Sequence, residues 1–384
     1  MVFSGLEFIF IFFPFVVTMG VMVHKWTNIQ NIVLLLLSLL FYAWGEPKYI
    51  WLFVITILLN WAMVLVGSVL CKNVFCGKNK SVNNARRDVK GTVGIITIVI
   101  DLLILIWFKY AGWIGEMLNI TVGSAGLPIG ISFYTFQAIS YVADVCLLNK
   151  NEAERNPVNV GLYIAFFPQL IAGPIVRYED MKEQIRERKM TFDAFEAGCF
   201  RFILGFCKKV LLADSMAVIA NKAWSGDLEN SFSFAWLGAI AYTLQIFMDF
   251  SGYSDMAIGL GSMFGFRIPE NFNNPYKATS IRDFWRRWHI TLSIWFRDYV
   301  YIPLGGNRKG AVRTVINIAI VWLLTGFWHG ANWTFVLWGV FYGILVLSEK
   351  TLDVEAKIKN GGGVGAADIQ TFYLADGYTL MGRV

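Results

Sequence analysis

The chain has 384 residues, of which 56% are hydrophobic and only 16% are charged, and its net charge is +6. A soluble domain carries about 25% charged residues, whereas here apolar runs near the roughly 20 residues that a bilayer core requires recur from end to end. The composition excludes an ordinary soluble protein and predicts an all-α, polytopic membrane protein. The positive charge does not indicate nucleic-acid binding, because the basic residues lie in short connections between runs, as in cytoplasmic loops.

The first apolar run, at about 8–23, lacks a basic segment before it, so we interpret it as a retained span and not as a cleaved signal. Further runs follow at about 32–44, 49–70 and 93–110. The polar connection at 71–90 is rich in Lys and Arg, which places it in the cytoplasm. Counting back three spans puts the N-terminus outside. The cysteines show no paired spacing for a metal, so no metal site is expected.

Charged and helix-breaking residues interrupt several of the later runs. Asp101, inside the fourth run, is expected to face other helices and find a donor. A fifth run lies at about 127–148, and a sixth, at about 160–176, is broken by Pro168 and by Gly173-Pro174. Two crossings separate the segment 177–190 from the strongly basic segment 276–313, so both should lie inside. From an external N-terminus this holds only if the fifth or the sixth run does not cross. We favour the broken sixth as re-entrant.

The seventh and eighth runs lie at about 194–212 and 234–264. Asp249 and Asp255, with Ser and Gly between them, suggest a broken or pore-lining helix in the eighth. The simpler alternative, which we prefer, is that each carboxylate is paired locally. With two more runs at 315–324 and 335–347, the chain is expected to have about nine to eleven spans, with one or more re-entrant or in-plane helices.

The segment 280–301 shows the clearest helical periodicity in the chain. It predicts one amphipathic helix with an apolar stripe and a polar stripe. The polar stripe consists of Arg282, Arg286, His289, Ser293 and Arg297. One interpretation is an in-plane helix whose basic face meets lipid headgroups. The other is that His289 and the arginines face an anionic donor bearing phosphate.

His329 lies in the stretch TGFWHGANW, between the last two apolar runs. An ionisable side chain at membrane depth is costly to hold, so it is a functional-site candidate by default. The alternative is a structural histidine that joins two helices through a hydrogen bond.

Several long motifs now occur together and in order. They are NFNNPY at 271–276, RDFWRRWHITLSIWFR at 282–297, YIPLGGNRKG at 301–310 and WHGANWTFVLW at 328–338. With the upstream segments FYAWGEPKY, LPIGISFYTFQ, FFPQLIAGPI and MDFSGYSDMAIGLG, they resemble the membrane-bound O-acyltransferase family, and within it the branch that takes part in alginate O-acetylation. The resemblance covers about residues 3 to 350.

The resemblance implies an acyltransferase of the bacterial cytoplasmic membrane. A cytoplasmic donor, expected to be acetyl-coenzyme A and not a bound cofactor, gives its acetyl group to a polysaccharide outside, through a partner acyltransferase. The essential histidine of the family corresponds to His329, and its second polar position to His289. The expected substrate-binding residues are Asn273, Asn274, Arg282, Arg286, Ser293, Arg297, Trp328 and Asn332. D-alanyl or another acyl transfer to a cell-wall polymer remains an alternative.

Ester formation requires a base and a group that stabilises the oxyanion. We assign His329 as the base, because an imidazole titrates close to the working pH. His289, with Asn273 or Asn274 as lesser candidates, is assigned to the thioester carbonyl. A polysaccharide-precursor transporter or flippase is the rival class, since broken helices and buried charges occur there also. No inverted repeat is visible to support it.

After Lys350 the chain becomes polar and glycine-containing, whereas members of the family continue with further spans. We therefore expect a membrane-embedded domain over 1–350, incomplete at its C-terminal end, and a tail over 351–384 that is unlike the family.

Overall fold

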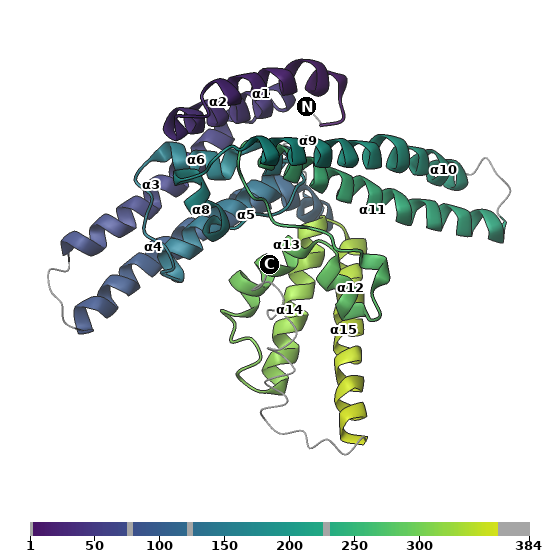
Figure 1. Ribbon diagram of the computed structural model, residues 1–384. Coiled ribbons are helices and arrows are strands. Elements are labelled where there is room, and N and C mark those ends of the chain that lie inside the picture. The colour runs from purple at the N-terminus through teal and green to yellow at the C-terminus, as the bar shows by residue number, and fades with distance from the viewer. Residues whose placement is uncertain (1–2, 75–79, 121–125, 226–230, 360–384) are drawn as a thin grey trace. The chain divides into compact units, whose positions relative to one another are not determined.

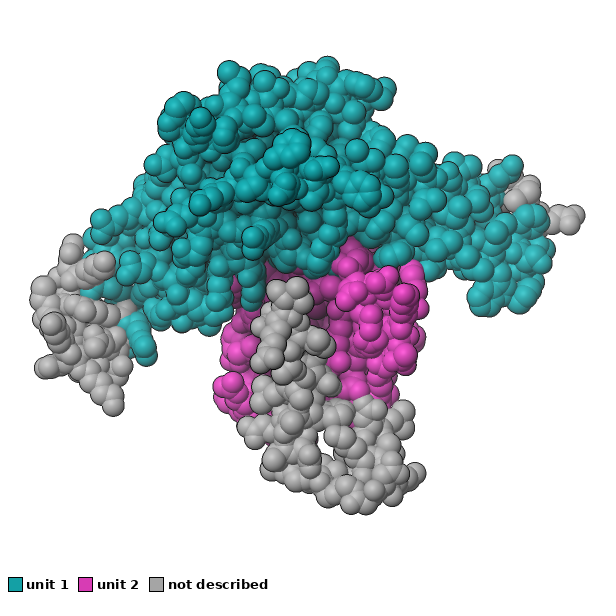
Figure 2. Space-filling view, viewed as in Figure 1, with its two compact units in different colours: residues 1–108, 124–271 teal, residues 109–123, 272–384 magenta. Residues whose placement is uncertain are grey.

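Helices dominate the computed structural model, which describes residues 3–74, 80–120, 126–225 and 231–359, with only the backbone described at 72–74, 80–86 and 352–359 (Figure 1). The chain forms two compact units, coloured separately in Figure 2. Unit 1 comprises residues 1–108 and 124–271, and unit 2 comprises 109–123 and 272–384. Within the described ranges the only extended pairing is one isolated antiparallel bridge, Phe272 to Trp288. The all-α prediction is confirmed.

Unit 1 holds the N-terminal helices and the long pair α9 and α11. Its elements are η1 (Phe8–Phe12), α1 (Phe13–Met22), α2 (Thr27–Gly45), α3 (Ile50–Val74), most of α4 (Lys80–Leu118), α5 (Ile131–Val142), η2 (Ala143–Leu147), α6 (Pro157–Ala165), α7 (Phe167–Leu170), α8 (Tyr178–Arg186), α9 (Phe192–Cys207), η3 (Lys208–Ala213), α10 (Asp214–Trp224) and α11 (Phe232–Met263).

Unit 2 begins with the end of α4 and resumes after Asn271. Its further elements are η4 (Pro275–Lys277), α12 (Ile281–Arg287), α13 (Ile290–Phe296), η5 (Arg297–Tyr301), α14 (Ala311–His329) and α15 (Trp333–Lys359).

Four helical segments in the described part of the chain are long and apolar enough to cross a membrane. They are Thr27–Gly45, Ile50–Cys71, Arg87–Leu118 and Ala311–His329. The first and fifth predicted runs form the shorter apolar helices Phe8–Met22 and Ile131–Leu147. Several membrane spans are therefore present, and the larger predicted count stays a prediction. The connection expected over 71–90 is shorter than predicted, because α3 continues to Val74 and α4 already begins at Lys80.

Asp101 lies inside α4 and is 1% exposed. Asn60 of α3 donates a hydrogen bond from Nδ2 to Oδ1 of Asp101 over 3.0 Å. Asn60 is itself fully buried, so the hydrogen bond joins two buried polar side chains inside unit 1. The expectation that this carboxylate faces another helix and finds a donor is confirmed, and the pair ties α3 to α4.

The sixth apolar run is broken, as predicted. Helix α6 ends at Ala165, the four-residue α7 follows, and the chain then runs without a helix to Arg177. Non-helical backbone needs partners when it is buried. Tyr163 supplies one, because its hydroxyl donates to the carbonyl oxygen of the non-helical Val176 over 2.9 Å. Whether this segment is re-entrant stays a prediction.

Helices α9 and α11 approach closely because glycines face one another. A Cβ added at Gly198 would lie 2.6 Å from the carbonyl oxygen of Gly259, and one at Gly205 would lie 2.5 Å from that of Gly252. The two glycines of each helix are about two turns apart, so they share one face. Small residues let helix backbones meet in this way where lipid removes the hydrophobic drive between helices.

Helix α11 is continuous from Phe232 to Met263, so the expectation of a broken helix around Asp249 and Asp255 is wrong. The charges are paired with α9 and η3 instead. Asp255 accepts from Arg201 at 2.7 Å and from Lys208 at 2.5 Å, and Asp249 pairs with Lys209 at 2.9 Å. The two lysines lie in η3, a π-helical turn that directly follows α9. Local pairing, the alternative preferred above, is confirmed.

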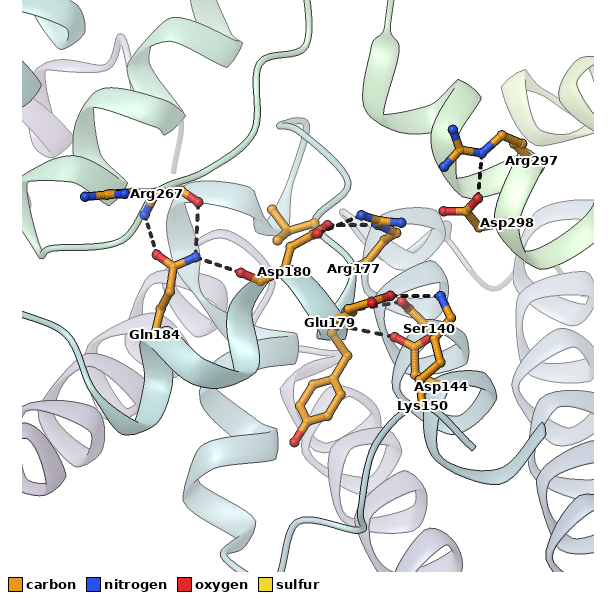
Figure 3. Close-up of polar contacts among 12 residues, drawn as sticks. Ser140, Asp144, Lys150, Arg177, Glu179, Asp180, Gln184, Arg267, Arg297 and Asp298 are labelled. Carbon is orange, nitrogen blue, oxygen red and sulfur yellow. Dashed lines mark hydrogen bonds and ion pairs between the residues drawn. The ribbon is translucent and has the colours of Figure 1, made fainter. Parts of the chain in front are cut away.

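Helix α8 is a short amphipathic helix held by polar contacts from α5 and η2 (Figure 3). The backbone N–H of Tyr178 donates to Oγ of Ser140, and that of Glu179 to Oδ2 of Asp144, both over 3.3 Å. The first N–H groups of a helix lack intrahelical acceptors, so these side chains cap α8 from a neighbouring helix. Its apolar face is buried in unit 1 and consists of Tyr178, Met181 and Ile185.

In unit 2, α14 and α15 pack through glycines in the same manner. A Cβ at Gly326 would lie 2.6 Å from the carbonyl oxygen of Phe335, and one at Gly339 would lie 2.5 Å from that of Trp322. This close approach brings the end of α14, where His329 lies, against the first turns of α15.

Candidate active site

His329 is the last residue of α14. Its imidazole contacts aromatic rings on both sides of the turn into α15. The ring centroids of Trp328 and Trp338 lie 5.0 and 4.9 Å from it, both nearly edge-on, and that of Phe335 lies 6.3 Å away in a stacked orientation. The side chain of His329 is nevertheless exposed, so a reacting group can reach it.

His289 lies between α12 and α13 and is 3% exposed. Its backbone is left-handed, with φ 46° and ψ 52°, a conformation that residues with a Cβ rarely adopt. Burial, and after it the charge of His329, lowers the pKa of His289 well below its usual value. The imidazole is therefore neutral near neutral pH, as a hydrogen-bonding group beside a carbonyl needs to be.

Trp328 brings the two histidines together. Its ring centroid lies 5.7 Å from that of His289 and 5.0 Å from that of His329. The two imidazoles, forty residues apart in the sequence, thus contact one indole inside unit 2. This arrangement places the two histidines near each other, and their catalytic roles stay predictions.

The single helix predicted over 280–301 is wrong. Helix α12 ends at Arg287, Trp288 is extended, and α13 starts after His289. The extended Trp288 pairs with Phe272 in the antiparallel bridge, and the N–H of Asn273 donates to the carbonyl oxygen of Arg287 over 2.9 Å. At Trp288 this antiparallel pairing replaces the helical hydrogen bonds, so the helix ends there. The predicted polar stripe is therefore not one continuous face.

The arginines of that stripe have different surroundings. Arg282 pairs with Glu349 of α15 at 3.4 Å, and Glu349 also accepts from the backbone N–H of Arg282 over 3.1 Å. Arg297 pairs with its neighbour Asp298 at 2.6 Å (Figure 3). Arg286 is exposed.

Asp283 and Arg287 form the i, i+4 pair that their spacing favours, with Nε of Arg287 3.0 Å from Oδ1 of Asp283. The hydrogen bond from Arg287 holds the pKa of the Asp283 carboxyl below its usual value. Oγ of Ser280 accepts from the N–H of Asp283 over 3.1 Å, so Ser280 is the N-cap of α12.

The remaining predicted binding residues are exposed. Asn273 and Asn274 form the turn before η4, and Oγ of Ser293 donates to the carbonyl oxygen of Trp285 over 3.4 Å. Asn332 accepts from the N–H of Thr334 over 2.9 Å, so it caps the start of α15. Asn332 therefore has a structural role as a helix cap, and its role in substrate binding stays a prediction.

Two groups of residues beside the histidines were not predicted from the sequence. Lys109 and Tyr110, near the end of α4, contact the last residues of α14. Trp285, Trp322, Trp338 and Tyr342 form an aromatic cluster, with centroids of Trp285 and its three neighbours 4.9–5.5 Å apart. A lysine inside an apolar run was a signal of the same kind as Asp101. The cluster had no such signal, because aromatic residues are common throughout the chain.

Comparison with known proteins places this site in a family. A family model described as the membrane-bound O-acyltransferase family matches residues 39–354. The chain is 43% identical over 370 residues to the probable alginate O-acetylase of Azotobacter vinelandii, covering 94% of this chain and 70% of the relative. It is 36% identical to the peptidoglycan O-acetyltransferase of Helicobacter pylori, over 81% of this chain and 62% of the relative.

A third relative, the teichoic acid D-alanyltransferase of Streptococcus thermophilus, is 30% identical over 58% of this chain and 57% of its own length. The family match covers both histidines, the Trp328 contact and the α14–α15 turn. It confirms an acyltransferase and sets the transporter alternative aside. With most of its length matched by the family model, this multi-pass chain belongs to the membrane-bound O-acyltransferase family.

Proposed function

We propose that this acyltransferase moves acetyl groups from a cytoplasmic donor, acetyl-coenzyme A, for the O-acetylation of a polysaccharide outside the membrane. The observation that supports the chemistry most directly is that the imidazoles of His289 and His329 both contact the indole of Trp328. The choice of acetyl and polysaccharide rests on two relatives whose names specify O-acetylation, which match 94% and 81% of the chain. The D-alanyl alternative rests on a match to 58% of it.

In the proposed reaction a hydroxyl group attacks the carbonyl carbon of the donor thioester. His329 takes the hydroxyl proton while the new C–O bond forms. The C–S bond then breaks, and the imidazolium returns the proton to the departing thiolate, which leaves as the free thiol. His329 fits the role of base because it is exposed at a helix end, where an acceptor can approach.

His289 is proposed to donate a hydrogen bond to the thioester oxygen as negative charge develops there. Its burial supports this role, since a fixed donor in a water-poor site stabilises charge more than one in water. Asn273 and Asn274 are weaker candidates for it, because both side chains are exposed.

The donor phosphates are proposed to meet the basic residues of α12. Arg286 is exposed, so an anion can reach its guanidinium. Arg282 and Arg297 are proposed to contribute after exchanging their carboxylate partners, Glu349 and Asp298, for phosphate. Trp328, Ser293 and Asn332 complete the proposed binding set, and a partner acyltransferase is proposed to receive the acetyl group outside.

The chain is proposed to lie in the bacterial cytoplasmic membrane with its N-terminus outside. Two contacts support the proposed order of crossings. Nε1 of Trp44 donates to Glu7 over 3.1 Å, so the start of the first run and the end of the second lie together, as two crossings require. The ends of α4 and α14, both assigned to run outward, also meet, at Lys109 and Trp328.

The test uses native membranes, which retain the proposed partner acyltransferase, with the full chain, acetyl-coenzyme A, and either oligomannuronate or peptidoglycan fragments as acceptor. Thiol release is measured, and the acceptor is examined by mass spectrometry for added acetyl. His329→Ala is expected to lower the rate by about 10²–10⁴-fold. His24→Ala is the matched control, because His24 is exposed between α1 and α2, where its Nδ1 lies 2.7 Å from the carbonyl oxygen of Val21.

Full activity of His329→Ala would refute the assignment of the base. Acylation from a D-alanyl carrier protein, with none from acetyl-coenzyme A, would favour the D-alanyl alternative.

A further inference from the structure

The C-terminal end of α14 needs partners for its carbonyl groups. The last four carbonyls of an α-helix have no N–H one turn further on, and α14 ends at His329 with Gly330 already extended. The carbonyls of Phe327 and Trp328 are among these four. How they are satisfied decides how firmly the residue that follows them, His329, is held.

Helix α4 supplies the partners inside unit 2. Nζ of Lys109 donates to the carbonyl oxygen of Trp328, and the hydroxyl of Tyr110 donates to that of Phe327. Both acceptors belong to the two residues immediately before His329. Helix α4 therefore caps α14 from outside, through two consecutive side chains.

The same face of α4 makes ring contacts with this turn. The Lys109 ammonium lies 5.8 Å from the centroid of the Trp328 ring, within the range of a cation–π contact. The Tyr110 and Trp113 rings each lie 6.4 Å from that of Phe327, and Trp113 lies 5.4 Å from Trp333 at the start of α15. One face of α4 thus contacts both the end of α14 and the start of α15.

The charge of Lys109 suits its position. A helix C-terminus carries a partial negative charge, and a cation there is stabilising. A lysine inside an apolar run is costly unless it meets such a partner. The partial negative charge at the end of α14 stabilises the Lys109 ammonium in this apolar run. The ammonium in turn fixes the Trp328 carbonyl, next to His329.

We propose that Lys109 and Tyr110 are positioning residues for His329: they fix the last turn of α14 and with it the place of the imidazole. This inference rests on the proposed function of His329 as base. A general base must be held within hydrogen-bonding reach of the proton it takes, and a displacement of about 1 Å in such a site costs on the order of 10²-fold in rate.

The experiment compares four variants of the full chain in membranes, assayed by release of thiol from acetyl-coenzyme A. Lys109→Met removes the donor and the charge, Lys109→Gln keeps a neutral donor, Lys109→Arg keeps both, and Tyr110→Phe removes only the hydroxyl. Lys90→Met is the matched control, because Lys90 lies on the same helix, in unit 1, and donates to Asn149 over 3.3 Å.

We expect Lys109→Met to lower kcat by about 10–100-fold, with KM for acetyl-coenzyme A within about twofold of the parent. Lys109→Arg should recover most of kcat, and Lys109→Gln part of it. Tyr110→Phe should lose several-fold, and Lys90→Met should match the parent. A structural role alone would lower the amount of folded protein without this division between kcat and KM.

A double-mutant cycle connects the effect to His329. If Lys109 acts through the base, Lys109→Met should add no further loss to the residual rate of His329→Ala. The inference would be overturned if the losses of the two single variants multiplied in the double variant. An unchanged kcat in Lys109→Met, or an effect of that variant on KM alone, would overturn it as well. If Lys109→Met does not fold, Tyr110→Phe and Lys109→Gln decide the matter in the same cycle.

The two proposals fail in different ways. An active His329→Ala would refute the proposed base whatever Lys109 does. An inactive His329→Ala with independent Lys109 effects would refute the positioning role alone.

Discussion

His289 combines burial with a left-handed backbone, and the two properties have different consequences for substitution. The position costs an ordinary L-residue about 1–2 kcal/mol, whereas Asn adopts it with less strain. The surrounding chain holds the conformation, because the Trp288 bridge and the start of α13 fix both sides of it. Strain held in this way at a buried titratable residue points to a role for its side chain.

We therefore expect His289→Asn and His289→Ala to be equally inactive but unequally stable. Both remove Nε2 of the imidazole, which reaches further from the backbone than an Asn amide, so each should lower kcat by about 10²–10³-fold. His289→Ala keeps the backbone strain that Asn relieves, so its melting temperature in detergent should be the lower of the two. Full activity of His289→Ala would mean that the imidazole has no part in the reaction.

The residues of the site were partly predictable. The depth of His329 in an apolar stretch and the periodic placement of His289 both identified candidates. The contact of both rings with Trp328 was not predictable, because it depends on how α14 meets the α12–α13 break. Lys109 was visible as a lysine inside an apolar run, but its role was not predictable, because its partner is a backbone carbonyl.

At the scale of elements, apolar runs predicted where helices lie better than they predicted where helices stop. The break at His289 follows from pairing with Phe272, a residue distant in sequence. Conversely, the Ser and Gly residues near Asp249 suggested a break that does not exist. Partners on α9 and η3 stabilise the carboxylates there, and the continuous helix persists. Tertiary partners decided both cases.

Glycine contacts between helices can be tested at this scale. A Cβ at Gly326 would lie 2.6 Å from a backbone oxygen of α15, which cannot move without shifting that helix. We expect Gly326→Ala to destabilise the α14–α15 pair by about 1–3 kcal/mol. It should also lower activity, because His329 lies one turn further along. Thermal unfolding in detergent and the thiol-release assay measure the two effects.

Gly112→Ala is the control for this substitution. Gly112 lies in α4 with no atom within 4 Å of an added Cβ, so alanine should be neutral or stabilise the helix by up to about 1 kcal/mol. Equal melting temperatures for the two variants would argue against the close packing of α14 on α15.

For the whole molecule, composition was sufficient to predict the class and the all-α fold, because a bilayer admits few other spanning structures. Motif order was sufficient for the family. The division into two units was not foreseen, since α4 is one uninterrupted helix whose last turns belong to unit 2. The expected domain over 1–350 stays a proposal, and most of the tail predicted over 351–384 lies outside the described residues.

Topology is the remaining prediction at this scale, and it can be tested with single cysteines in a chain whose native cysteines are replaced by serine. Lys48, Lys25 and Lys309 are suitable positions, because they lie at or next to connections between helices and Lys48 and Lys25 are exposed. If the N-terminus is outside, a membrane-impermeant maleimide should label Lys48→Cys in intact cells. Lys25→Cys and Lys309→Cys should react only in inverted vesicles, because basic connections remain in the cytoplasm. Labelling of Lys309→Cys from outside would reverse the assignment of α14, and would place His329 toward the cytoplasmic face, where it would meet the donor before the acceptor.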